Sequence, residues 1–247
     1  SKMHVMPECV LFADSKAQIK DIVRYCFENT IPITTRGRGT GNTGGSVPIE
    51  NSVVLSLEKM NKIIDIDISN RLAVVQPGVI NKTLQDELQK ENFFWGPDPS
   101  SQDYSTIGGN IANNSAGPRA IKYGTPRDNI LGLEFISGTG EIHKTGVKTS
   151  KGVVGLDLTR LFVGSEGVLG ILSEATLKIL PLNNSVKTFE ITFETLKSAS
   201  DMIIMLMTQP ITPYKLEFVD EQSVKLINSI KKNHFEINTK SAVLLEI

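Results

Sequence analysis

The run Arg36-Gly37-Arg38-Gly39-Thr40-Gly41-Asn42-Thr43-Gly44-Gly45 places five glycines and two arginines within ten residues. Glycine adopts positive φ at little cost, so successive backbone N–H groups of such a run can converge on an anion without a helix. Arg36 or Arg38 would add positive charge, and the Thr and Asn side chains between them and Gly44 would add donors. A mobile surface loop would have the same composition, so the run alone leaves an anion-binding loop and a plain loop equally open.

Part of this run, Gly39 to Gly44, matches the dinucleotide-binding pattern G-x-G-x-x-G. That pattern holds a pyrophosphate when it follows a strand and opens a helix. Here Gly45-Ser46-Val47-Pro48 comes next, and a strand-like apolar run follows it. The sequence therefore predicts no Rossmann helix at this point, and the match is interpreted as accidental.

Two further segments are rich in small residues. The second segment is Pro97-Asp98-Pro99-Ser100 followed by Ser105-Thr106-Ile107-Gly108-Gly109-Asn110-Ile111-Ala112-Asn113-Asn114-Ser115-Ala116-Gly117, and the third is Gly164-Ser165-Glu166-Gly167-Val168-Leu169-Gly170-Ile171. The second segment has no acid–base pair and no nucleophile with its base, so it suits holding a large, planar, polar ligand better than hydrolysis. Its Thr106, Asn113 and Ser115 could equally stabilise turns.

Glycine also divides the chain. All 20 glycines lie between Gly37 and Gly170, and the residues before and after that range contain none. This distribution predicts a domain that binds a ligand with its backbone, followed by an ordinary packed domain. The polar stretch within Pro181–Ser185 is the expected boundary, which gives domains over residues 1–182 and 183–247.

Hydrophobic periodicity predicts an opening β-α-β unit: strand Cys9–Phe12, a helix capped by Asp14 or Ser15, and strand Ile31–Thr35. Further strands are expected at Val53–Leu57, Ile63–Ile66, Leu72–Val75, Ile130–Ile136, Glu141–Thr145 and Leu169–Leu180, and helices at Asn81–Glu91 and Asp157–Phe162. The stretch Trp95–Gly124 shows no period, and so long a connection usually carries function. The tail is expected to alternate β-α-β-α-β, and to end on an apolar strand without a closing element. Together with Ser1 in place of methionine, this ending suggests a truncated chain.

Composition excludes several classes of protein. With 26 basic and 27 acidic residues and 40% hydrophobic residues, the chain is globular and has no surface built for nucleic acid. No apolar run approaches the length of about 18 residues that a membrane span needs. Cys9 and Cys26 are expected to be reduced core thiols, and His4, His143 and His234 are too scattered for a metal site, so none is predicted. A soluble, cytoplasmic protein is expected.

The three segments, in this order and at these separations, resemble the FAD-binding PCMH-type domain of the vanillyl-alcohol oxidase/p-cresol methylhydroxylase superfamily. Within it the likeness is greatest to the D-2-hydroxyacid dehydrogenases, and it covers about Pro7–Pro181. The resemblance implies an α+β fold: a two-subdomain FAD-binding domain over residues 1–182, followed by the start of an α+β substrate-cap domain over residues 183–247.

The resemblance also implies how the cofactor would be held. The first segment would wrap the FAD pyrophosphate, the second would line the path to the isoalloxazine and ribityl chain, and the third would meet the adenine side or the ribityl chain. The implied cofactor-binding residues are Arg36, Gly37, Arg38, Gly39, Thr40, Gly41, Asn42, Thr43, Gly44, Pro97, Asp98, Ser105, Thr106, Gly108, Gly109, Asn110, Asn113, Ser115, Ala116, Gly117, Glu166, Gly167, Gly170 and Ile171. Ile107 and Ile171 are equally plausible as core residues. The first loop lacks the histidine that links flavin covalently in some members, so non-covalent FAD is expected.

The activity implied is FAD-dependent oxidation of a small D-2-hydroxyacid, of the glycolate or D-lactate type, with hydride transfer to flavin N5. The electron acceptor would be a quinone, a cytochrome or a partner subunit, and a quinone would leave a peripheral position at the inner membrane open. In that family the base and the metal-binding histidines lie mainly in later sequence, so no catalytic residue is assigned and the fragment alone is expected to turn over poorly. Two alternatives stay open: another enzyme with the same domain, such as an alkyl-dihydroxyacetone-phosphate synthase or a sugar-nucleotide enolpyruvyl reductase, or a non-catalytic electron-transfer subunit.

Overall fold

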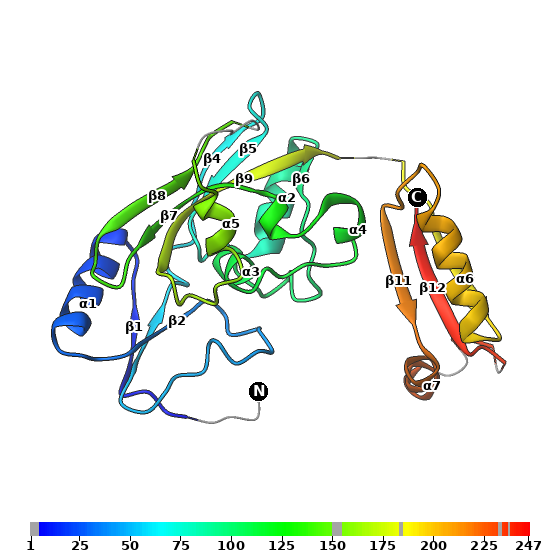
Figure 1. The fold of residues 1–247 in the computed structure, drawn as a ribbon, viewed down its shortest axis with the longest axis horizontal. Coiled ribbons are helices and arrows are strands. Elements are labelled where there is room, and N and C mark those ends of the chain that lie inside the picture. The colour runs from blue at the N-terminus through cyan, green and yellow to red at the C-terminus, as the bar shows by residue number, and fades with distance from the viewer. Residues whose placement is uncertain (1–4, 150–154, 183–184, 232–233, 237) are drawn as a thin grey trace. The chain divides into compact units, whose positions relative to one another are not determined.

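The computed structural model describes residues 5–149, 155–182, 185–231, 234–236 and 238–247 (Figure 1). The chain forms two compact units. The first contains Ser1–Gly117 and Gly124–Leu182, and the second contains Pro118–Tyr123 and Asn183–Ile247. The division expected from sequence left Pro118–Tyr123 in the first domain, whereas this short segment packs with the second unit.

The first unit opens with a three-stranded parallel sheet in the order β1-β3-β2. Its strands are β1 (Cys9–Phe12), β2 (Ile33–Arg36) and β3 (Val53–Ser56), and helix α1 (Lys16–Glu28) connects β1 to β2. The helix begins where the Ser15 side chain accepts a hydrogen bond from the Gln18 N–H, and its residues Ile19, Val23 and Cys26 are buried. The predicted β-α-β unit and the Ser15 cap are confirmed.

A six-stranded sheet forms the rest of the first unit (Figure 1). Five strands run in the order β4-β5-β9-β7-β8, all with antiparallel neighbours, and β6 pairs with β9 at a separate point. The strands are β4 (Ile63–Asp67), β5 (Leu72–Val75), β6 (Phe93–Trp95), β7 (Ile130–Ile136), β8 (Ile142–Gly146) and β9 (Ile171–Pro181). Helices α2 (Asn81–Lys90) and α5 (Leu158–Phe162) complete this part, close to the ranges predicted.

Two hydrophobic clusters hold the first unit together. The larger lies on the six-stranded sheet and includes Trp95, whose indole N–H donates to the Asn129 carbonyl at 3.3 Å. The smaller joins α1 and β3 to the adjoining ends of β7 and β9, where Ile136 and Ile171 are buried. The two sheets of the first unit therefore share an apolar cluster.

The segment expected to be without period contains two short helices, α3 (Ile107–Asn113) and α4 (Ala120–Tyr123), and a 3₁₀ turn η1 (Pro126–Asp128). Helix α3 was missed because it is only seven residues long and contains two glycines, which disfavour helix. Thr106 caps its N-terminus, and Asn114 ends it in the left-handed conformation with φ of 49°.

The second unit has the predicted β-α-β-α-β order: β10 (Thr188–Phe193), α6 (Leu196–Met207), β11 (Lys215–Val219), α7 (Glu221–Ile230) and β12 (Ser241–Glu246). Its antiparallel sheet has the order β10-β12-β11. The segment Pro118–Tyr123 packs on Tyr214: the ring of Tyr123 meets it edge-on at 5.5 Å, and the Arg119 guanidinium lies 5.3 Å from its centre. No described helix of either unit is long and apolar enough to cross a membrane.

Candidate cofactor-binding site

The glycine-rich loop leaves the carboxyl end of β2 and returns to β3. All residues between Gly37 and Ser52 are described and none is helical, so the Rossmann-like match in this loop lacks the helix that it needs, as predicted. Gly39 and Gly44 have φ values of +67° and +94°. Arg38 is engaged by Glu58 at 2.6 Å, so part of the loop's positive charge is already paired.

The loop backbone lies directly against the start of α3. A Cβ atom added to Gly37 would come within 2.3 Å of the Thr106 Oγ1 atom. That hydroxyl oxygen also accepts the Gly109 N–H at 3.1 Å and so caps the helix. Only glycine permits this approach, which brings the first and second small-residue segments together.

Side-chain contacts bring the third segment to the same place. The Thr43 hydroxyl lies 3.3 Å from the Asn113 Oδ1 atom and 3.1 Å from the Glu166 Oε2 atom, so its one hydrogen is shared between two acceptors. The Glu166 N–H donates to the Ala112 carbonyl at 2.9 Å. Glu166 has a φ of +52°, and its carboxylate covers Gly45, where an added Cβ would lie 2.5 Å from Oε2.

These contacts enclose one pocket, and all three segments line it. The predicted residues that line it are Arg36, Gly37, Arg38, Gly39, Thr40, Gly41, Thr43, Thr106, Gly108, Gly109, Asn113, Glu166, Gly167 and Gly170. Backbone amides, arginines and hydroxyl groups dominate this set. Such donors suit a phosphate-bearing ligand.

The other predicted residues do not line this pocket. They are Asn42, Gly44, Pro97, Asp98, Ser105, Asn110, Ser115, Ala116, Gly117 and Ile171. Several form a buried scaffold behind α3 instead. The Asn81 amide donates to Asn110 at 2.9 Å, Asn110 donates to the Ser105 hydroxyl at 3.0 Å, and a Cβ on Gly117 would lie 2.0 Å from the Asp98 carbonyl oxygen.

Gly45, the last residue of the predicted first segment, also lines the pocket, and sequence reasoning missed eight other lining residues: Thr35, Ser46, Leu57, Pro77, Ile111, Ala112, Phe162 and Leu172. Some carried a usable signal, because they lie inside or next to the quoted segments. Leu57, Phe162 and Leu172 carried none, because an apolar residue that lines a pocket has the same sequence pattern as one in the core.

A second, broader pocket adjoins the first and shares three lining residues with it, Thr35, Gly167 and Gly170. Its remaining lining is largely apolar and comes from α1, the start of β2 and the β7–β8 turn, including Val23, Cys26, Phe27, Ile31, Pro32, Ile33, Ile136, Gly138 and Ile171. Burial raises the pKa of the Cys26 thiol, with a further contribution from Cys9, so the thiol is neutral here. Ile171 therefore belongs to this pocket.

The candidate site contains no histidine. His143 lies 3.7 Å from Glu141 and His234 lies 3.1 Å from Glu190, and both imidazoles are about 40–46% exposed. Within the described residues, no group of three or more His, Cys, Asp and Glu side chains could hold a metal ion. The chemistry available in the pocket is therefore binding by donors and a single carboxylate, that of Glu166.

A pocket lined by backbone amides, arginines and hydroxyl groups identifies a candidate site for a phosphate-bearing nucleotide. The family model described as FAD binding domain matches residues 7–146, which is more than half of the chain. The chain belongs to this family, with the PCMH-type fold and FAD as its cofactor.

Individual relatives indicate which members of this family the chain is similar to. Over 241 residues the chain is 41% identical to the glycolate oxidase subunit GlcD of Bacillus subtilis (strain 168). The match covers 98% of this chain and 51% of that protein. It is 38% identical over 218 residues to a D-lactate dehydrogenase of Anaerostipes hadrus, covering 88% of this chain and 46% of the relative. The chain thus spans about half the length of the curated relatives that it matches.

Among solved structures, an alkyldihydroxyacetonephosphate synthase superposes with a TM-score of 0.83 over 96% of this chain and 46% of its own, at 22% sequence identity. An identity this low supports the fold and says nothing of the reaction. The expected α+β fold class is confirmed.

Proposed function

We propose that this chain is the FAD-binding part of an enzyme that oxidises a small D-2-hydroxyacid, of the glycolate or D-lactate type, to the 2-oxoacid. The observation that carries the proposal is the convergence of three small-residue segments on one pocket. Relatives named glycolate oxidase subunit and D-lactate dehydrogenase support the substrate class. The first unit would be the cofactor domain, and the second would be the start of a substrate-cap domain.

In this proposal, each pocket has a distinct role. The loop Arg36–Gly45 would bind the FAD pyrophosphate through backbone N–H groups and Arg36, since Arg38 is already paired with Glu58. The apolar second pocket would take the flat adenine ring beside Ile31 and Ile171. The remaining wall, along α3, would face the ribityl chain and the isoalloxazine.

The bound flavin would supply the hydride acceptor for the C2–H of the substrate. The residues of this chain would bind and orient it. The Glu166 carboxylate accepts hydrogen bonds and repels phosphate, so it would face hydroxyl groups of the cofactor and not the pyrophosphate. The apolar side chains of Leu57, Phe162 and Leu172 would exclude water from the inner wall of the pocket.

FAD is expected to be bound without a covalent link, because the glycine-rich loop contains no histidine. Precipitating the flavin-loaded protein with acid should release all the flavin into the supernatant. The absorbance of supernatant and pellet at the flavin maximum is the measurement. Yellow colour that stays with the washed pellet would contradict the expectation.

Anaerobic flavin bleaching tests the substrate class. The complete protein, loaded with FAD, should lose its flavin absorbance on addition of D-lactate or glycolate, because hydride transfer reduces the ring. L-Lactate, which has the same charge and groups with opposite handedness, is the matched control and should bleach much more slowly. Full FAD occupancy without bleaching by any of several 2-hydroxyacids would reject the proposed activity, while failure to bind FAD would reject the site itself.

A further inference from the structure

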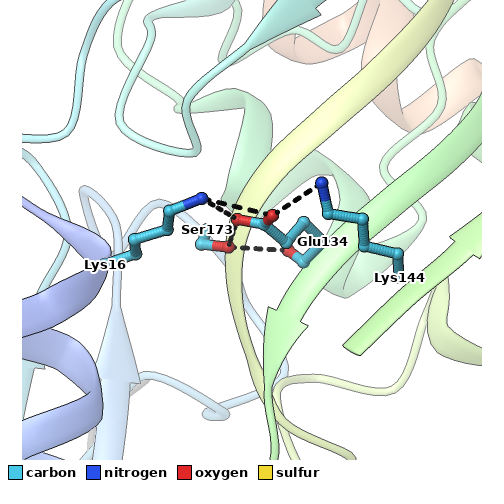
Figure 2. Close-up of polar contacts among 4 residues, drawn as sticks. All are labelled: Lys16, Glu134, Lys144 and Ser173. Carbon is cyan, nitrogen blue, oxygen red and sulfur yellow. Dashed lines mark hydrogen bonds and ion pairs between the residues drawn. The ribbon is translucent and has the colours of Figure 1, made fainter. Parts of the chain in front are cut away.

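A buried carboxylate lies where α1 meets the six-stranded sheet of the first unit, outside the pockets described above. Glu134 on β7 is only 4% exposed. Lys16 of α1 reaches it from one side, at 3.1 Å and 3.3 Å from its two oxygens, and Lys144 of β8 reaches it from the other at 3.2 Å (Figure 2). The Ser173 hydroxyl of β9 lies 2.9 Å from the same carboxylate and 3.1 Å from the Glu134 backbone carbonyl, so its one hydrogen is shared between these two acceptors.

Ser173 is the extra residue of a β-bulge. Along the β7–β9 ladder, Glu134 pairs with Glu174, and the next residue, Phe135, pairs with Leu172, so Ser173 has no partner of its own. Bulges bend a strand and redirect the residues next to them, and they are frequent beside functional sites. The Ser173 side chain therefore fastens this bulge to Glu134, as Figure 2 shows.

The residues just before the bulge line both pockets. Leu172 lines the first pocket, Ile171 lines the second, and Gly170 lines both. Gly170 is packed tightly against β7, because a Cβ added to it would come within 2.8 Å of the Ile136 carbonyl oxygen and of the Phe135 ring. A small shift of β9 at this point would change the walls of both pockets.

We propose that Glu134 is a positioning residue for the cofactor: it fixes the bulge at Ser173 and thereby holds Gly170–Leu172 in the conformation that accepts FAD. This inference rests on the proposed FAD site. The two lysines tie the carboxylate to α1 and to β8, so three elements meet at one group. Lys16 and Lys144 are 53% and 74% exposed, but the carboxylate between them is buried, and leaving a buried carboxylate partly unsatisfied is costly, which favours one position of the segment.

The charge state of Glu134 is set by the same contacts. Burial raises the pKa of its carboxyl, and hydrogen bonds from Lys16, Ser173 and Lys144 outweigh that effect, so the pKa lies below its usual value. A lowered pKa in the folded state stabilises the fold above the unfolded-state pKa of about 4.3, and this contribution is lost as the pH falls through the folded-state pKa. The difference in melting temperature between the wild type and Glu134→Gln should therefore be largest at neutral pH and should shrink below about pH 4.

Glu134→Gln and its matched control test the positioning role. Glu174→Gln makes the same change of charge on the residue that pairs with Glu134, outside both pockets. Flavin fluorescence titration at neutral pH, well below the melting temperature, should give a dissociation constant for FAD about tenfold higher in Glu134→Gln. Glu174→Gln should stay within about twofold of the wild type.

Two further variants separate positioning from general destabilisation. Ser173→Ala removes only the hydroxyl that joins the bulge to Glu134 and should weaken FAD binding in the same direction. Ile179→Val, a buried change further along β9 and outside both pockets, should lower the melting temperature without changing the affinity. In the FAD-free protein, the backbone amides of residues 170–173 should exchange hydrogen faster in Glu134→Gln than in Glu174→Gln.

The outcomes are distinct. FAD binding by Glu134→Gln and Ser173→Ala with wild-type affinity, or unchanged exchange at residues 170–173, would overturn the inference and leave the proposed FAD site intact. An equal loss of affinity in Ile179→Val would also overturn it, because general stability would then account for the effect. A wild-type protein that binds no FAD would overturn both.

Discussion

Gly44→Val should bind FAD at least about tenfold more weakly than the wild type, because left-handed backbone costs a residue with a side chain roughly 1–2 kcal/mol and a β-branched residue resists it most. Gly44 has a φ of +94°, and it lies between Thr43 and Gly45, which both line the pocket. Valine would move the loop toward negative φ and displace these two neighbours. The dissociation constant from flavin fluorescence is the measurement.

Gly155→Val is a close control for this variant. Gly155 has a φ of +85°, and among the described residues no atom lies within 4 Å of a Cβ added to it or to Gly44, so the two substitutions bring similar backbone strain. Gly155 lies outside the pocket, and its variant should keep its flavin. Equal loss of FAD from both variants, with equal loss of melting temperature, would show that strain alone explains the result.

Trp95→Ala should lower the free energy of unfolding by about 3–5 kcal/mol, the range for removing a large aromatic side chain from a core. Trp95 is the only tryptophan, is fully buried, and donates its indole N–H to the Asn129 carbonyl. Its loss would leave a cavity beside β9 and remove one of the two hydrogen bonds that the Asn129 carbonyl accepts, the other coming from the Lys178 N–H at 2.9 Å. Urea unfolding followed by far-UV circular dichroism is the measurement, since the variant has no tryptophan fluorescence.

Trp95→Phe separates the contribution of the apolar volume from that of the indole hydrogen bond. It keeps most of the apolar volume and loses the hydrogen bond, so its cost should be clearly smaller than that of the alanine variant. A Trp95→Ala protein as stable as the wild type would contradict the core described here. Replacing an exposed residue such as Leu156, which is 89% exposed, with alanine should change the free energy of unfolding by no more than about 0.5 kcal/mol.

Regular elements were predictable because their hydrophobic period is strong. Helix α1 shows buried residues at Ile19, Val23 and Cys26, and β3 is a short apolar run, so each could be placed within a residue or two. The glycine loop was also correctly kept apart from a Rossmann turn, because the residues after Gly45 could not begin a helix. Local sequence was sufficient for these features.

Features that depend on contacts distant in sequence could not be predicted in this way. Helix α3 depends on its Thr106 cap and on the buried pair of Asn81 and Asn110, which are 29 residues apart. Polar residues such as Ser105 and Asn110 look alike in sequence whether they face a ligand or a buried amide. Nothing in the sequence pattern marked Glu134 as a buried, paired carboxylate, because its partners come from three other elements of the fold.

Because Pro118–Tyr123 belongs to the second unit, the two units are joined by three peptide bonds, which follow Gly117, Tyr123 and Leu182. A chain that ended at Leu182 would keep this hexapeptide but lose Tyr214, on which the Tyr123 ring and the Arg119 and Lys122 side chains pack. The backbone after Gly117 continues the same segment that lines the pocket at Asn113. Between Asn113 and β7 the main chain therefore runs through the second unit.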